Sequence, residues 1–109
     1  MVVQMSDAEV DRIFHALADA TRRDIVRRTL LGQASVSELA AAYDMSFAAV
    51  QKHVAVLESA GLIHKQVSGR QRLVHADPET LERARNLLAD YENLWRARVQ
   101  RLDEMFEGE

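Results

Sequence analysis

Apolar residues recur at helical spacing through most of the chain, and this pattern predicts five helices and one pair of strands. The first helix is expected over residues 7–18, behind a cap at Ser6 or Asp7 and an acidic first turn. Its apolar face, which is expected to pack against the core, consists of Val10, Ile13, Phe14 and Leu17.

A second helix is expected between a cap at Asp19 and a stop at Gly32. Arg22 and Arg23 in its first turn oppose the helix dipole, so each of them needs a partner. An ion pair within the domain is expected for Arg23, whereas the partner of Arg22 stays open. The core-facing side chains of this helix are expected to be Ile25, Val26 and Leu30, with Leu31 as a further candidate.

Two short helices follow over residues 37–43 and 46–60, with Ser46 as a cap and Gly61 as a stop for the second. Two short helices joined by a tight turn predict a helix-turn-helix over residues 37–60. One face of the second helix is apolar, and the opposite face is small and carries one cation. Taken alone, this helix fits a DNA groove and an ordinary surface position equally well. The small face consists of Ala48, Lys52 and Ala55, with Gln51 on its edge.

Residues 62–76 contain two short runs, LIHKQV and QRLVHA, on either side of Ser68-Gly69-Arg70. Gly69 supplies the turn, and the spacing predicts a β-hairpin with a three-residue tip. Arg70 and Arg72 make the hairpin basic, as is typical of the wing of a winged helix that reaches DNA phosphates.

Asp77 and Pro78 open a last helix that is expected over residues 79–106. Its apolar residues alternate at spacings of three and four, which is the pattern of a coiled-coil seam. Such a helix either wraps its own domain or pairs with a second copy, and we favour a homodimer formed by this helix together with helix 7–18. A polar residue within the seam, here Arg98, can set the register by pairing with an acid of the partner. The expected interface consists of Phe14, Leu81, Leu88, Tyr91, Trp95, Arg98, Leu102 and Met105.

The length of the chain predicts one domain over residues 1–109. The expected elements make this domain mainly α with a small β-hairpin, in the order of four helices, two strands and one helix. The chain has no cysteine, no apolar window of membrane length and no signal-peptide pattern at its start, so we expect a cytoplasmic protein without a membrane segment.

The net charge of −3 conceals an uneven distribution along the chain. Residues 20–75 hold eight Lys and Arg against four acids, whereas the flanking segments hold the other six cations and thirteen acids. A basic centre between acidic ends is expected where only the centre meets phosphate.

No catalytic residues are predicted, because the chain offers no nucleophile with a base and no paired carboxylates. His64 and His75 can approach each other across the hairpin, but two imidazoles fall short of the usual four ligands of a metal site. We therefore predict no metal and no cofactor.

The sequence resembles the ArsR/SmtB-type winged-helix transcriptional repressors over roughly residues 10–76. The most specific part is VSELA, followed after a gap by AVQKHVAVLESAGLI. The resemblance implies a homodimer that binds an inverted-repeat operator in double-stranded DNA, with the terminal helices as the dimer interface. It departs from the metal-sensing branches, since the chain lacks cysteine and residues 79–109 lack histidine. The effector stays unknown.

Within this framework the helix that begins at Ser46 is expected to enter the major groove. Gln51 can pair with adenine and Lys52 with guanine or a phosphate, whereas His53 is expected to lie within the domain. Phe47 is left open between a thymine contact and core packing. A winged helix that binds only another protein is the alternative function. The expected DNA-binding residues are Ser46, Phe47, Ala48, Gln51, Lys52, Arg70, Gln71 and Arg72.

Overall fold

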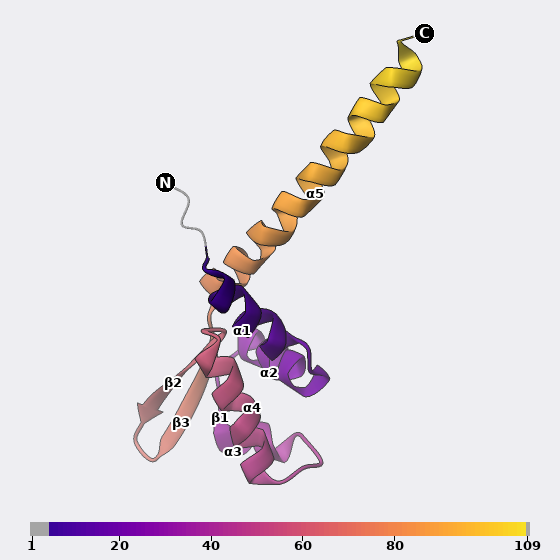
Figure 1. Ribbon diagram of the computed structural model, residues 1–109. Helices are drawn as coiled ribbons and strands as arrows, with labels where there is room; N and C mark the ends of the chain where they lie inside the picture. The colour runs from indigo at the N-terminus through magenta and orange to yellow at the C-terminus, as the bar shows by residue number, and fades with distance from the viewer. Residues whose placement is uncertain (1–4, 109) are drawn as a thin grey trace.

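Four helices and a three-stranded sheet form a small domain, from which a long fifth helix projects (Figure 1). The computed structural model describes residues 5–108. The elements are α1 (Asp7–Leu17), α2 (Ala20–Leu31), β1 (Ala34–Ser35), α3 (Val36–Ala41), α4 (Phe47–Ser59), β2 (Ile63–Ser68), β3 (Gln71–Ala76) and α5 (Pro78–Glu107). The predicted winged helix-turn-helix order is thereby confirmed, with one additional strand.

Polar side chains cap the helices at the positions where the chain enters them. Ser6 forms a capping box with Glu9 at the start of α1, and Asp19 accepts from the backbone N–H of Arg22 at 3.0 Å. The predicted start of the third helix at Ser37 is wrong. Ser35 is its cap, because its hydroxyl accepts from the N–H of Glu38 at 3.0 Å while the Glu38 carboxylate accepts from the N–H of Ser35.

The sheet has the order β1-β3-β2, and all its pairs are antiparallel. Strand β1 was not predicted, because two residues are too few to show a period of two. The three-residue hairpin tip is also wrong. Ser68 pairs with Gln71, so only Gly69 and Arg70 form the tip, and the positive φ of 62° at Gly69 suits a tight two-residue turn.

One apolar core joins the helices to the sheet. Leu30 and Leu31 do not belong to it, contrary to the expectation, since these residues are 49% and 78% exposed. Thr29 is turned inward instead, and its hydroxyl donates to the carbonyls of Ile25 and Val26 at 2.9 and 3.0 Å. The largest fully buried side chains are Ile13, Ile25, Leu39, Leu57, Leu62, Ile63, Val50, Val54 and Val74.

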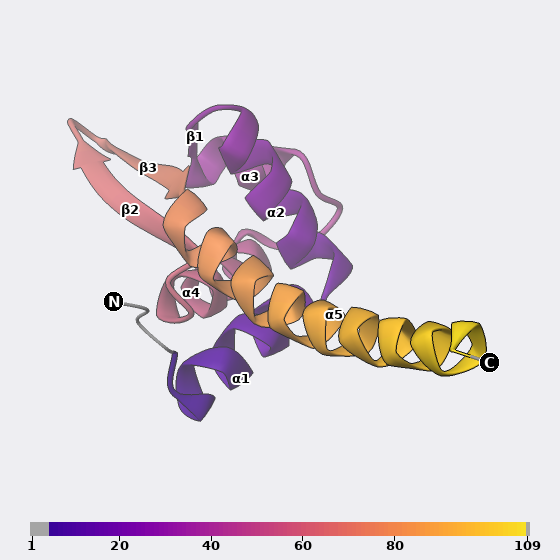
Figure 2. The same ribbon diagram turned by 90° about the horizontal axis from the view of Figure 1, so that it is seen from above.

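Helix α5 leaves the domain after its first two turns, and Figure 2 shows from above how far it extends beyond the other elements. Asp77 caps it by accepting from the N–H groups of Glu79 and Thr80 at 3.0 and 3.3 Å. Its only buried side chains are Thr80 and Ala84. The projecting helix gives the molecule a length of 70 Å against widths of 33 and 24 Å. No helix within residues 5–108 has the length and apolar character to cross a membrane.

Candidate nucleic-acid interface

The N-terminal half of α4 presents the small polar face that the sequence predicted. The Ser46 hydroxyl accepts from the N–H of Ala49 at 3.1 Å and fixes the first turn. The apolar stripe of the helix is buried, which turns Ala48, Gln51 and Lys52 to solvent. These three side chains lie on an exposed helix surface of the kind that fits a major groove.

Phe47 stands at the edge of this surface rather than in the core. Its side chain is 47% exposed, although it is large and apolar. The alternative of core packing is therefore ruled out for this residue, and the ring lines the same hollow as Gln51. An exposed aromatic ring beside a polar recognition face can make apolar contacts with a bound partner.

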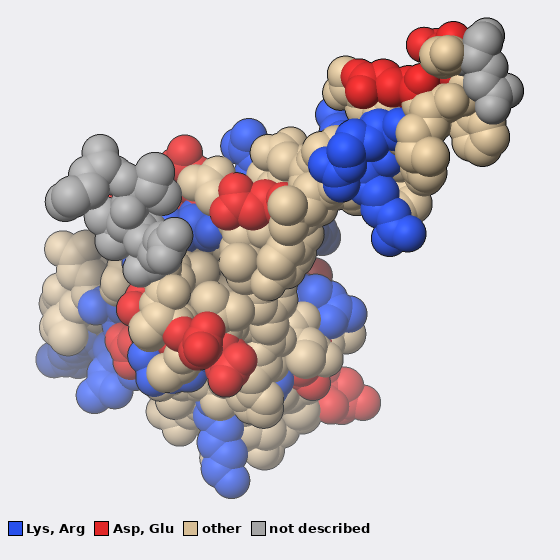
Figure 3. Space-filling model, turned by 45° about the horizontal axis from the view of Figure 1, so that its top comes forward, with Lys and Arg blue, Asp and Glu red and all other residues tan. Residues whose placement is uncertain are grey.

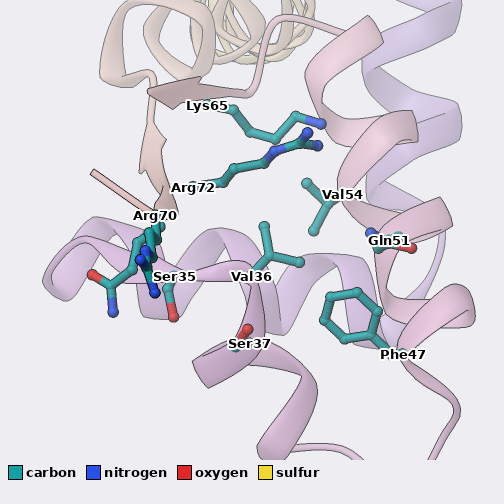
Figure 4. A pocket seen from close by; sticks show the side chains of 10 residues that line it. Ser35, Val36, Ser37, Phe47, Gln51, Val54, Lys65, Arg70 and Arg72 are labelled. Carbon is teal, nitrogen blue, oxygen red and sulfur yellow. The ribbon is translucent and has the colours of Figure 1, made fainter. Parts of the chain in front are cut away.

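A hollow of about 340 Å³ separates α4 from the wing and from the start of α3 (Figure 4). From the wing, Lys65 and Arg72 extend across it toward α4, whereas Arg70 lies near Ser35. The hollow is therefore basic on its wing side and small and polar where α3 begins. Its lining consists of Ser35, Val36, Ser37, Phe47, Gln51, Val54, Lys65, Arg70, Gln71 and Arg72.

The basic side chains of this face differ in whether an acid already neutralises them. Within residues 5–108, none of Lys52, Arg70 and Arg72 forms an ion pair. Lys65 is 3.5 Å from the Glu58 carboxylate of α4. Three cations are thus available to an external anion, and a fourth is shared with the domain.

Lys65 is the charged lining residue that the sequence prediction missed. It lies on β2 directly opposite Val74 of β3, and directly opposite residues of an antiparallel pair project from the same face of the sheet. Counting alternate positions along β2 was the signal that could have placed it on the side facing α4.

Arg22 does not belong to this face, because its guanidinium contacts the end of α1 and His53 of α4. The Nε atom donates to the carbonyl of Ala16 at 2.7 Å and an Nη atom donates to that of His15 at 3.0 Å. The other Nη atom lies 3.3 Å from Nδ1 of His53, whose ring is packed within the domain as predicted. Arg22 therefore closes the C-terminus of α1 and ties it to α4.

Arg23 also acts on α1 rather than in an ion pair. Its guanidinium donates to the carbonyl of Leu17 at 2.8 Å, so the predicted ion pair of this residue is wrong. For both arginines, hydrogen bonds to the free carbonyls at the C-terminus of α1 compensate for the unfavourable position of a cation at the N-terminus of α2.

The helix-turn-helix is held to α2 by a polar cluster. The Tyr43 hydroxyl donates to Asp24 at 2.5 Å, and Nε of Arg28 donates to the same carboxylate oxygen at 2.7 Å. These two hydrogen bonds lower the pKa of Asp24, the one from Tyr43 most strongly. Burial and the neighbouring carboxylate raise the pKa of Tyr43 to about 12. The cluster fixes the end of α3 and thereby the entry into the turn before α4.

His64 and His75 lie directly opposite each other at the base of the wing, as the sequence suggested. The Nε2 atom of His64 is 2.7 Å from the Asp77 carboxylate, and this contact is the main cause of a lowered pKa of Asp77. Within residues 5–108, no group of three or more His, Cys, Asp or Glu side chains is arranged to hold a metal ion.

The predicted dimer-interface residues fall into two groups. Leu81 is packed against the core of its own protomer and Phe14 is partly buried. The others form an exposed stripe along the projecting part of α5, where Figure 3 shows surface without Lys, Arg, Asp or Glu beside a basic group and, nearer the C-terminus, an acidic group. This stripe consists of Leu88, Tyr91, Trp95, Arg98, Leu102 and Met105.

The sequence is similar to known transcriptional regulators over most of its length. A family model described as a helix-turn-helix domain matches residues 17–66. The HTH-type transcriptional regulator Rv2034 of Mycobacterium tuberculosis is 39% identical over 85 residues, which cover 78% of this chain and 77% of that protein.

Solved structures extend the similarity to the fold. An ArsR family transcriptional regulator superposes with a TM-score of 0.80 and 35% identity, covering 86% of this chain and 97% of its own. An ArsR-like transcriptional regulator from Rhodococcus sp. RHA1 has a TM-score of 0.80 at 28% identity, covering 90% of this chain and 92% of its own. The chain therefore belongs to the ArsR family of winged helix-turn-helix transcriptional regulators, a family of DNA-binding proteins rather than enzymes.

Proposed function

We propose that this regulator is a homodimeric repressor or autoregulator that reads an inverted-repeat operator through α4 and the wing. The observation that carries the proposal is the shared orientation of two features. Gln51 and Phe47, at the edge of the exposed face of α4, line the same hollow as the unpaired Arg70 and Arg72 of the wing, so a single duplex can engage both elements. The helix would occupy the major groove and the wing the neighbouring backbone.

Base reading is assigned to the exposed side chains in the first turns of α4. Gln51 can form two hydrogen bonds with adenine, and Lys52 can reach guanine or a phosphate. Ala48 and the exposed ring of Phe47 can contact thymine methyl groups. Ser46 and the free N–H groups of its turn can bind a phosphate.

Backbone contacts are assigned to the wing. Arg70 and Arg72 carry charges that no acid of the described chain neutralises, and Gln71 lies between them. Such contacts give affinity and register without sequence preference. Lys65 is added to this set because it lines the same hollow, although Glu58 shares its charge.

The homodimer is proposed from the stripe of α5, whose large apolar side chains are exposed in the protomer. A structural neighbour from Mycobacterium bovis with 19% identity is described as a homodimeric winged helix-turn-helix DNA-binding domain. A two-fold dimer would present two copies of α4 about 34 Å apart to two half-sites. A DNA ligand of this kind implies a cytoplasmic location.

Selection of bound sequences from random duplexes at 0.15 M salt, a condition close to physiological ionic strength, tests the proposal. We expect enrichment of one inverted repeat whose half-site centres lie about one helical turn apart. Salt-sensitive binding without an enriched sequence would overturn sequence-specific reading. Absence of DNA binding would favour the alternative of a protein-interaction module, against which the unpaired cations of the wing argue.

A further inference from the structure

A groove between α1 and α4 lies outside the proposed DNA interface and outside the stripe of α5. It consists of two adjoining hollows of about 310 and 250 Å³, and both are lined by Arg12 of α1 and Ser59 of α4. The groove ends at the first two turns of α5, where Thr80 and Arg83 line the second hollow. None of its lining residues is among the predicted DNA-binding or dimer-interface residues. Neither proposed partner therefore accounts for its chemistry.

The two hollows differ in polarity. Besides the shared residues, the first is lined by the ring of His15 and by the small apolar side chains of Ala55 and Val56. The second is mainly polar and contains the carboxylate of Glu9 and the guanidinium of Arg83. A ligand that fills both hollows needs an apolar body with a polar group at one end.

The polar hollow has a surplus of one positive charge. Its only acid, Glu9, is already engaged, because its carboxylate accepts from Nη2 of Arg83 at 2.8 Å and from the Ser6 hydroxyl at 3.1 Å. Within residues 5–108, Arg12 forms no ion pair, and the buried Nε of Arg83 has no hydrogen-bond partner. A buried donor without a partner indicates a missing acceptor. One carboxylate would balance the charge of Arg12 and bring an acceptor to the guanidinium of Arg83.

We propose that the groove binds an amphipathic monocarboxylate, which is a small molecule with one carboxylate and an apolar body. The carboxylate would lie between Arg12 and Arg83, because a guanidinium presents planar donors that match a carboxylate. The apolar body would lie along Ala55 and Val56 and cover them from water. A compact dianion such as inorganic phosphate would exceed the surplus charge and leave the apolar hollow empty. This site goes beyond the proposed function, and its test needs no DNA.

Three helices meet at the polar hollow and hold its groups in place. The ion pair of Glu9 with Arg83 joins α1 to α5. Gly61, which follows α4, has a positive φ of 76°, and a Cβ at this position would lie 3.6 Å from the Thr80 hydroxyl of α5. The two arginines that would hold the carboxylate lie on helices, which fixes their positions more closely than loops would.

A titration of the full chain with octanoate at neutral pH, followed by two-dimensional amide NMR, tests the proposal. We expect octanoate to shift the amide signals of Arg12, Ser59 and Gly61, which border the groove. Octanol lacks the charge and acetate lacks the apolar body, so each is expected to bind about tenfold more weakly than octanoate.

Arg12→Gln tests the charged end of the site. Arg12 is exposed and forms no ion pair within residues 5–108, so circular dichroism should show an unchanged fold. We expect the substitution to weaken octanoate binding about fivefold, as for a partly exposed ion pair, and to leave octanol binding unchanged. Arg96→Gln is the matched control, because it removes the same charge from α5 outside the groove. It should change neither affinity.

Absence of octanoate binding, or amide shifts confined to the stripe of α5, would overturn the proposal. Equal affinities for octanoate and octanol would do the same, since the arginines would then have no role. An equal loss in Arg12→Gln and Arg96→Gln would mean that net charge rather than a site attracts the carboxylate. Sequence selection on DNA is a separate measurement, so its failure would leave this result standing.

Discussion

Lys52 and Arg70 are the residues at which DNA binding can be tested most sharply, because neither has an ion-pair partner within the described chain. We predict that Lys52→Ala and Arg70→Ala each weaken binding and each lower the slope of log K against log salt by about one counterion. The loss arises because each substitution removes one cation that is expected to neutralise a phosphate. Fluorescence anisotropy over a range of salt concentrations gives both quantities.

Arg96→Ala is the matched control for these substitutions. Arg96 is exposed on α5, away from the wing, and its guanidinium pairs with Glu92 of the same helix at 2.6 Å. Removing it changes the net charge equally, so an unchanged slope is expected. An equal effect of all three substitutions would mean that net charge rather than a localised surface drives binding.

At the scale of single elements, the start of α3 depends on Ser35 rather than Ser37. Ser35→Ala should destabilise the protein by roughly 1 kcal/mol, because it removes the hydroxyl that caps the helix. Ser37→Ala is the control, since this residue is exposed and does not cap the helix. Urea denaturation measures both variants. Equal stability of the two variants would contradict the assignment of the cap.

The cluster of Asp24, Arg28 and Tyr43 predicts a pH dependence of the attachment between α2 and α3. Tyr43→Phe should lower stability at neutral pH by about 1 kcal/mol, because the carboxylate loses its shortest hydrogen bond. The pKa of Asp24 is lowered in the folded state, so its contribution is complete above its unfolded pKa of about 4 and is lost as the pH falls through the folded value.

At alkaline pH, Tyr43 makes stability fall as the pH rises, which is opposite to the effect of Asp24 at acidic pH. The pKa of Tyr43 is raised to about 12, so its contribution is present below the unfolded pKa of about 10 and is lost as the pH rises toward 12. Denaturation between pH 2 and pH 11 should show that the free energy of unfolding of wild type exceeds that of Tyr43→Phe, and that this difference is largest near neutral pH. A difference in unfolding free energy that does not change with pH would contradict the role of the Asp24 charge.

The sequence predicted the elements that local periodicity and caps define. Helices α1, α2, α4 and α5 begin at or next to the expected caps, because Ser6, Asp19, Ser46 and Asp77 act on their own first turns. Strand β1 was missed because its two residues form a strand only through pairing with Leu73 and Val74, about forty positions later.

The part of the candidate site that lies on one helix was predictable from the sequence, whereas the part that depends on packing between elements was not. The outward face of α4 followed from its helical period, but the exposure of Phe47 and the inward reach of Lys65 depend on how the wing packs beside α4. Arg22 was ambiguous for a related reason. Its partners are carbonyl groups at the end of the preceding helix, and no charge pattern in the sequence indicates them.

At the scale of the whole molecule, one residue joins the wing to the projecting helix. Asp77 caps α5, accepts from Nε2 of His64 at 2.7 Å through its carboxylate, and donates its backbone N–H to the carbonyl of Leu62 at 2.8 Å. The base of the wing and the first turn of α5 are thereby held together. Pairing of two α5 helices would for this reason also fix the separation of the two wings.

The most direct measurement of the central claim is the affinity of the wild-type chain for the selected operator and for the same duplex with one half-site scrambled. If a dimer reads both half-sites through α4, two chains bind the intact duplex and scrambling reduces affinity at least tenfold, since several base contacts are lost at once. Equal affinity for both duplexes, or binding of a single chain to the intact operator, would contradict the account.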